Sequence, residues 1–310
     1  MRKTGGICLM GILLLAGAAL PASSQNQQSE LKVSANDDSV RLKETLERVG
    51  GRVRTFQEDL FNVKWTAVHR GQQLKADLTP KGKPLESVVD WIIVRRIAKG
   101  DPQKTYSVAV TEAKLVEGKP PREKKPYVPP EDPKFAYRHQ LDFLSPDKQA
   151  EWVFGWEGET DLKGMKAVMI TAAPAEVTKP VTRIEKGRFS VEGLQRKARV
   201  WVDAQTYDVL QVEWRLLETV NFKTKFGLSW RGPFFVTRPA REIEFEKMDQ
   251  TIRFERVSFK NPDQTLLLPV SEEHLRVIRG GRNPAYRSTV SYVDYKRFVT
   301  DVKVKTPDQN

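Results

Sequence analysis

The chain has 310 residues, a formal net charge of +12 and a single cysteine, Cys8. Because Cys8 lies in an N-terminal leader, the chain that remains has no disulfide, thiolate nucleophile or cysteine metal ligand. No nucleophile elbow, phosphate-binding loop or dinucleotide fingerprint occurs. The histidines are scattered and lack the paired spacing of a zinc site. We therefore expect no enzyme, no metal and no cofactor.

The N-terminus has the three parts of a secretory leader. Arg2 and Lys3 precede an apolar run from Ile7 to Leu20, and small residues follow near Ser24. The run of about 14 residues is short for a membrane anchor, which needs roughly 20. Cys8 lies at the start of this run, so lipid attachment there is not expected. We expect a signal peptide over residues 1–24, and a soluble periplasmic protein with a charge of about +10.

The next segments predict a tail and then a helix. Residues 25–36 are polar, and we expect a disordered tail there. From residue 38 onward apolar residues recur at helical spacing, which predicts a helical region over 38–61. Gly50 and Gly51 interrupt the pattern, so we expect either a kink or two short helices at 38–49 and 52–61. The expected apolar face consists of Val40, Leu46, Val49, Val53, Phe56 and Leu60.

Beyond the helix the apolar period changes to two, which is typical of antiparallel strands. In the strand expected at 208–217, alternation directs Trp214 to the core and Gln211 to solvent. A slip in the alternation near Glu255 and Arg256 predicts a β-bulge. We expect strands at 137–143, 165–171, 199–203, 208–217, 242–247, 251–259 and 265–270, with turns at 203–208, 248–250 and 261–263. Short connections of this kind predict a meander.

A proline-rich segment interrupts the strand pattern. Six prolines lie between Gly118 and Pro133, and proline removes a ladder donor, so no central strand fits there. We expect a surface loop over 118–134 within a single domain that spans 37–304. The alternative is a linker between two domains.

The basic residues and the tryptophans each allow two interpretations of their role. The basic residues alternate with Asp and Glu along the strands, which favours a solvated face over a nucleic-acid site; an anionic membrane surface or an envelope protein stays open as a partner. The seven tryptophans are either ordinary core or the lining of a lipid site. An aromatic-rich segment at 226–235 favours a binding or membrane-contact surface.

The segment Ala198–Glu213 (ARVWVDAQTYDVLQVE) resembles a hairpin of the periplasmic lipoprotein-carrier superfamily. Trp201 and Asp203 end its first strand. The later LLLP at 266–269 and the strand that ends at Phe298 are similar to large uncharacterised members of this group. The resemblance implies a LolA-like half-barrel: a strongly curved antiparallel sheet around helices, with an apolar concave face that holds acyl chains.

These observations lead to a mainly β (α+β) fold, with a half-barrel meander wrapped around the N-terminal helical region. The expected function is non-enzymatic binding of a hydrophobic or lipid-bearing ligand in the periplasm, as in a lipid or lipoprotein carrier. Two alternatives stay open: an envelope interaction module with a filled core, and a hydrolase with paired carboxylates. The expected ligand-binding residues are Phe56, Leu60, Trp91 and Trp214.

Overall fold

A computed structural model gives the fold. It describes residues 24–61, 63–98, 101–116, 118–120, 140–185, 188–223, 227–231, 234–238, 242–260, 262–280 and 284–298. Two compact units divide the chain, residues 1–40 and residues 41–310. The first contains the start of helix α1 (Ser24–Asp59), and the second contains its last five turns and the strands. The proposed leader and most of the proline-rich segment lie outside the described residues.

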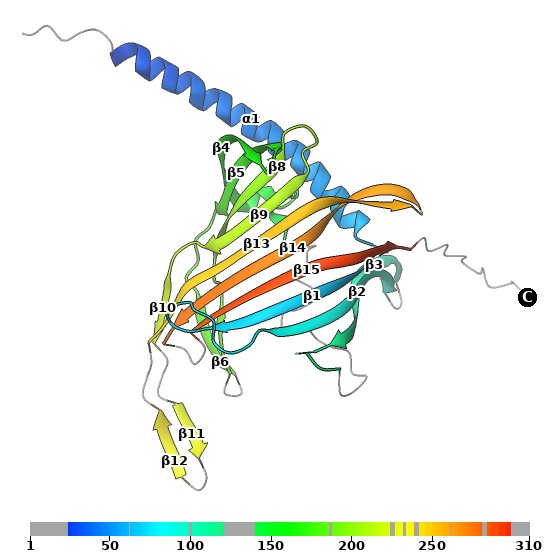
Figure 1. The fold of residues 1–310 in the computed structure, drawn as a ribbon. Coiled ribbons are helices and arrows are strands. Elements are labelled where there is room, and N and C mark those ends of the chain that lie inside the picture. Colours follow the sequence, from blue (N-terminus) through cyan, green and yellow to red (C-terminus); the bar gives the residue numbers. More distant parts are fainter. Residues whose placement is uncertain are drawn as a thin grey trace, which may run out of the picture. The chain divides into compact units, whose positions relative to one another are not determined.

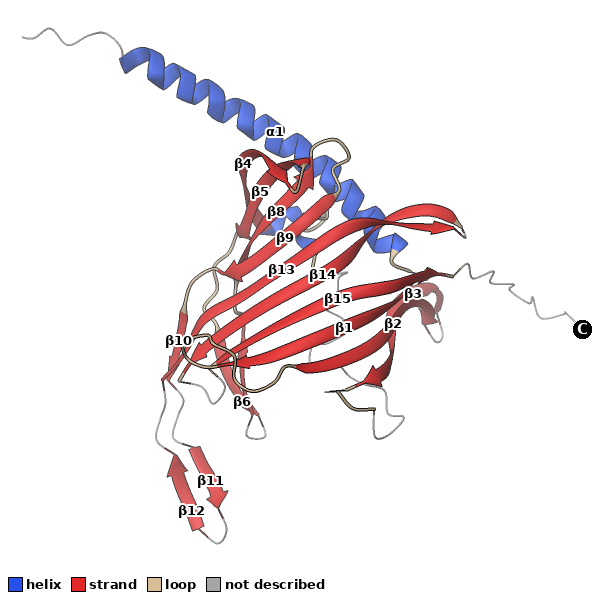
Figure 2. Ribbon diagram, viewed as in Figure 1, coloured by secondary structure: helices blue, strands red, loops and turns tan. Residues whose placement is uncertain are grey.

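The second unit is built of β-strands (Figure 2). They are β1 (Val63–Leu74), β2 (Leu85–Ala98), β3 (Asp101–Leu115), β4 (Trp152–Leu162), β5 (Met165–Pro174), β6 (Val181–Glu185), β7 (Arg188–Glu192), β8 (Arg196–Asp203), β9 (Val209–Leu216), β10 (Val220–Lys223), β11 (Gly227–Arg231), β12 (Phe234–Arg238), β13 (Glu242–Lys260), β14 (Asp263–Arg279) and β15 (Ala285–Arg297). Two short 3₁₀ turns, η2 (Asp142–Leu144) and η3 (Gln149–Glu151), precede β4.

One antiparallel sheet dominates this unit, as the sequence predicts. Its strand order is β3-β2-β1-β15-β14-β13-β9-β8-β5-β4, and β10 pairs with β13. The sheet curves and stays open, with β3 and β4 as edge strands in the described part of the chain (Figure 1). The mainly β half-barrel is thereby confirmed. The connection from β3 to β4 runs from one edge to the other, so part of it can cover the concave face.

Helix α1 differs from the expectation in two respects. It begins at Ser24, the last residue of the expected signal peptide, and so includes the whole segment 25–36, expected to be a disordered tail; it also continues through Gly50 and Gly51 without a break. Gly50 is buried because η2 and η3 approach it: a Cβ there would lie 3.0 Å from Pro146 Cγ and 3.1 Å from the Leu144 carbonyl oxygen. The glycine therefore permits close packing and does not end the helix. No described helix is long and apolar enough to cross a membrane.

Along β13 one prediction is wrong and another is confirmed. The turn expected at 248–250 is absent, because β13 runs unbroken through it and Gln250 pairs with Trp214 of β9. Gln250 tolerates burial because its amide is satisfied: Arg196 donates to Oε1 at 2.7 Å and Nε2 donates to Glu272 at 2.5 Å. The bulge expected near Glu255 and Arg256 is confirmed to within two residues. The register of β13 and β14 shifts between Arg253 and Phe254, and the strands pair evenly from Phe254 to Lys260.

The strand expected at 137–143 is also wrong for its described part. Leu141 is followed by the 3₁₀ turn η2, and its alternation reflects packing into the core from a turn. Gln57 of α1 donates to Asp142 at 2.5 Å, and Gln149 donates to the carbonyl of Leu46 at 2.9 Å. The segment of η2 and η3 is thus fastened to α1. Its buried apolar residues are Leu141, Phe143 and Leu144.

A continuous apolar core joins α1, η2 and the concave face of the sheet. Four of the helical positions expected on the apolar face are buried, namely Val49, Val53, Phe56 and Leu60. Val40 differs, with 59% of its surface exposed. Since both α1 and η2 cover the concave face, they fill more of it than a helix alone would.

Candidate functional site

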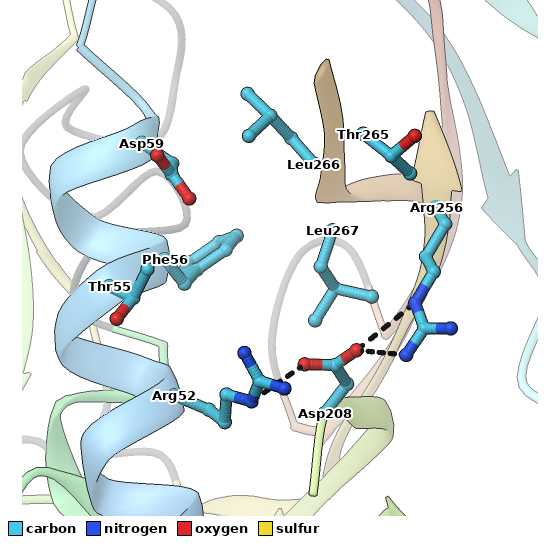
Figure 3. Close-up of a pocket in the computed structure, with 9 residues that line it drawn as sticks. All are labelled: Arg52, Thr55, Phe56, Asp59, Asp208, Arg256, Thr265, Leu266 and Leu267. Atoms are coloured by element: carbon cyan, nitrogen blue, oxygen red, sulfur yellow. Dashed lines mark hydrogen bonds and ion pairs between the residues drawn. The ribbon is translucent and has the colours of Figure 1, made fainter. Parts of the chain in front are cut away.

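A pocket of about 470 Å³ lies where the last turns of α1 meet the sheet (Figure 3). Its walls come from the last turns of α1, the residue before β9, the last third of β13 and the start of β14. The lining residues are Arg52, Thr55, Phe56, Asp59, Asp208, Arg256, Thr265, Leu266 and Leu267. This volume falls within the usual range of small-molecule sites, roughly 300–1,000 Å³.

The turn between β8 and β9 positions the central carboxylate of the pocket. Asp203 caps this turn, since its Oδ1 accepts the backbone N–H groups of Gln205 at 2.9 Å and Thr206 at 2.8 Å. Tyr207 adopts a φ of +60°, which redirects the chain into β9. These contacts place Asp208 at the pocket wall, with 9% of its surface exposed. The hairpin that carries the sequence resemblance thus also builds one wall of the pocket.

Two arginines share the carboxylate of Asp208. Arg256 donates from Nε at 3.1 Å and from Nη2 at 2.5 Å, both to Oδ2. Arg52 of α1 approaches Oδ1 with its Nε at 3.6 Å. Figure 3 shows Asp208 between the two guanidinium groups. The hydrogen bond to Asp208 raises the pKa of Arg256, so this side chain stays charged.

The same turn fastens α1 to the sheet. Arg52 Nε also donates to the carbonyl oxygen of Thr206 at 2.9 Å, and the guanidinium of Arg48 lies over the ring of Tyr207, 4.7 Å from its centroid. Arg48 and Arg52 are one turn apart, so they lie on one side of the helix. The pocket is therefore framed by contacts that hold its two sides together.

The rest of the wall is apolar, with one further acid. Phe56 packs edge-on against Phe254, with ring centroids 5.7 Å apart, while Leu266 and Leu267 lie on the facing strand. Asp59 lies one turn beyond Thr55 on α1. Burial raises the pKa of Asp59; Arg297 opposes this shift and Glu58 adds to it. The pocket thus has arginines near Asp208, an apolar middle and a partly desolvated carboxyl.

The lining residues of this pocket do not supply the pair of available carboxylates that a carboxylate-dependent hydrolase uses. A carboxylate-pair hydrolase needs one acid and a second carboxylate that is available as base or nucleophile. Among the nine lining residues Asp208 is the one carboxylate besides Asp59, and the two arginines already occupy it. In the described part of the chain no group of three or more His, Cys, Asp or Glu residues could hold a metal ion.

The structure places one of the four expected ligand-binding residues at this pocket. Phe56 lines it, while Leu60, Trp91 and Trp214 belong to the same core but not to the pocket wall. Trp91 stacks on Trp65 at 6.4 Å. Trp214 meets Phe143 at 4.8 Å and Trp152 at 5.8 Å. A ligand contact of Leu60, Trp91 and Trp214 stays a prediction, and it requires these aromatic contacts to open. The expected aromatic surface at 226–235 lies outside the described side chains.

The charged residues of the pocket were not identified from the sequence, although two signals pointed near them. Asp208 ends the turn of the carrier-like hairpin, and Arg256 lies where the alternation of β13 slips. To predict from these signals that these charged residues form one site, it is necessary to know that α1, β9 and β13 meet in the tertiary structure.

Comparisons with known proteins give structural matches alone. No family model matches the sequence, and no curated protein matches it. The chain is similar to a domain described as an outer membrane lipoprotein-sorting protein from Vibrio parahaemolyticus, with 12% identity and a TM-score of 0.38 over 82% of this chain and 92% of that one. A DUF1329 family protein from Desulfovibrio piger gives 13% identity and a TM-score of 0.38 over 84% and 94%.

A third similar structure is a LolA superfamily protein from Nitrosomonas europaea, with 10% identity and a TM-score of 0.33 over 84% of this chain and 97% of that one. Strand order and register define the fold of this chain.

Proposed function

We propose that this chain is a non-enzymatic periplasmic protein that binds an acyl-bearing ligand, as a lipid or lipoprotein carrier does. The observation that carries the proposal is the pocket beside Phe56, which is large enough for a ligand and is backed by apolar side chains. The leader-like N-terminus and the carrier-like hairpin support the same reading. We place the first ligand contacts at Phe56, Leu266 and Leu267.

A second candidate is an envelope interaction module that binds no lipid. The filled core favours it: Leu60, Trp91 and Trp214 have 2–5% of their surfaces exposed and are covered by other side chains. Interiors normally pack without voids, so a closed interior is the ordinary state of such a sheet. The two candidates differ in whether an amphiphile binds at all.

Calorimetric titration distinguishes the two candidate functions. The purified protein is titrated with a diacylated lipopeptide and with palmitate. We expect saturable binding of at least one of these probes. Leu267→Asn places a polar amide in the pocket wall and is expected to weaken binding about tenfold, in line with burying an unpaired polar group at a ligand contact. Leu275→Asn, at a half-buried position on the same strand but away from the pocket, is the matched control.

Tryptophan fluorescence locates the ligand. None of the nine lining residues is a tryptophan, so a ligand in the pocket is expected to leave the emission nearly unchanged. A ligand that enters the core between Trp91 and Trp214 would quench it strongly, and Trp91→Ala would then weaken binding. If neither probe binds to wild-type protein and lipid extraction recovers no lipid, the interaction module is the better description.

A further inference from the structure

The charges of Asp208, Arg52 and Arg256 do not cancel. Arg52 and Arg256 are both paired with a single carboxylate, so the triad retains a positive charge. The carboxylate itself is nearly buried, whereas the two arginine side chains are 53% and 50% exposed. A nearly buried anion therefore holds two cations whose outer ends reach the pocket and solvent.

The arginines keep hydrogen-bond donors that Asp208 does not use. A guanidinium carries five N–H donors in a fixed plane. Arg256 donates from Nε and Nη2 to Asp208, whereas Arg52 donates from Nε to the Thr206 carbonyl and forms an ion pair with Asp208 at 3.6 Å. Within the described residues, Arg52 Nη1 and Nη2 and Arg256 Nη1 have no hydrogen-bond partner. Because Asp208 and the Thr206 carbonyl fix the two planes, these remaining donors have set directions before any ligand arrives.

The other charge of the pocket lies away from this triad. Asp59 and Arg52 lie on opposite sides of Phe56 along α1 (Figure 3). An anion is attracted to the end of the pocket with the arginines and repelled from the end with Asp59, while an apolar chain can contact Phe56 and Leu267 between these ends.

We propose that Arg52 and Arg256 bind the phosphate or carboxylate headgroup of the acyl-bearing ligand, an inference that rests on the function proposed above.

A purely structural role for the arginines predicts something different. If the triad only fastens α1 to β9 and β13, replacing an arginine lowers stability and changes the affinity for all amphiphiles alike. If the arginines bind the headgroup, the replacement removes the preference among headgroups. Headgroup preference at fixed chain length is therefore the decisive quantity.

The experiment compares probes that each have a 12-carbon chain and are used below their micelle concentrations. Dodecyl phosphate and dodecanoate are anionic, dodecyl maltoside is neutral and dodecyltrimethylammonium is cationic. We expect the wild-type protein to bind the two anionic probes about tenfold more tightly than the maltoside, as a charge-assisted hydrogen bond allows. The preference should shrink as salt rises.

Arg256→Gln and Arg52→Gln are expected to abolish this preference while the maltoside affinity stays within about twofold. Arg253→Gln is the matched control, because Arg253 lies on the same strand, pairs with Glu273 at 2.6 Å and does not line the pocket. This variant should keep the wild-type preference. Circular dichroism and urea unfolding of each variant establish that it is folded at the temperature of the titration.

The outcomes separate the two proposals. Equal binding of all four probes, unchanged by either arginine variant, overturns headgroup recognition and leaves acyl binding intact. Absence of binding by every dodecyl probe overturns both. Inorganic phosphate that binds as tightly as dodecyl phosphate, and is lost in Arg256→Gln, supports the anion site but identifies a free anion as the ligand and overturns acyl binding.

Discussion

Asp90 of β2 is a buried carboxylate held by three donors. Lys64 Nζ lies 2.8 Å from Oδ2, while Lys114 Nζ at 2.7 Å and Thr66 Oγ1 at 2.8 Å contact Oδ1. Burial alone would raise the pKa of Asp90. The hydrogen bonds from Lys114, Lys64 and Thr66 together outweigh it and hold the pKa at about 2. This aspartate is thus more acidic in the folded chain than in the unfolded one.

The sign of this shift predicts a loss of stability in acid. The unfolded chain binds a proton at Asp90 near the ordinary value of 3.8, whereas the folded chain resists protonation until about 2. The ionised Asp90 carboxylate therefore adds to the free energy of unfolding above about pH 4, and this stabilisation disappears as the pH falls to 2. We expect Asp90→Asn to lower the free energy of unfolding by about 1–2 kcal/mol at pH 7, discounted because the lysines are partly exposed, and by little at pH 2.

Urea unfolding of both proteins at the two pH values tests this prediction. Asp147→Asn, at an exposed carboxylate, should show no such dependence on pH. An Asp90→Asn deficit of the same size at pH 2 and pH 7 would mean that the cost comes from packing and not from charge.

Trp214 gives a second prediction for a single residue. It is 5% exposed and touches Phe143, Trp152 and the guanidinium of Arg196, whose Cζ lies 4.9 Å from its ring centroid. We expect Trp214→Ala to cost about 3–5 kcal/mol, the usual range for a large buried aromatic. Arg215→Ala, at an exposed neighbour on the same strand, should cost within about 0.5 kcal/mol. Similar costs at both positions would contradict this assignment of the faces of β9.

At the scale of elements, the stability of α1 depends on its packing against the η2–η3 segment as well as on its own helix propensity. Gly50 lies against η2 and η3, while Gly51 has no heavy atom within 4 Å of an added Cβ. Alanine favours a helix over glycine by about 1 kcal/mol at either position. The surroundings therefore decide the sign of the substitution.

We expect Gly51→Ala to raise the free energy of unfolding by about 0.5–1 kcal/mol, because it adds helix propensity at no steric cost. Gly50→Ala should lower it by about 1–3 kcal/mol, since its Cβ would press on Pro146, Leu144 and Gln149 at 3.0–3.1 Å. Thermal and urea unfolding measure both. Stabilisation by Gly50→Ala would show that η2 moves away from the helix easily.

The sequence predicted those elements whose local pattern agrees with their tertiary setting. β9 is central, and its residues Leu210, Val212, Trp214 and Leu216 are buried as alternation required. Gln211 departs from the pattern: it is 7% exposed and donates to Glu213 at 3.1 Å. The prediction of a turn at Gln250 was wrong for the same reason. From the sequence alone, a polar residue that is buried and hydrogen-bonded cannot be distinguished from a loop residue. The pocket charges escaped prediction because three distant segments assemble them.

For the whole molecule, the chain from residue 37 on remains predicted as a single domain with a surface loop at 118–134. A short turn follows β3, in which Val116 and Lys119 exchange backbone hydrogen bonds at 2.8 and 3.0 Å. We expect replacement of Lys119–Pro133 by a brief Gly/Ser connection to leave one cooperative unfolding transition, because closure entropy depends weakly on loop length. Calorimetry checks this. Two separate transitions would favour the linker, and loss of cooperativity would mean that the segment packs.

The pairing of β1 with β15 has a consequence for how the chain reaches its fold. β1 follows α1 directly and pairs with β2 along one side. Along its other side it pairs with β15, so that Val63 lies opposite Arg297. Contacts this far apart in sequence are associated with slow folding. During synthesis β1, β2 and β3 can form a meander long before β15 exists, and the free side of β1 is then an open template for strands of other molecules. Aggregation during folding is therefore expected to begin at β1, and a chaperone that covers this strand until β15 arrives would raise the yield.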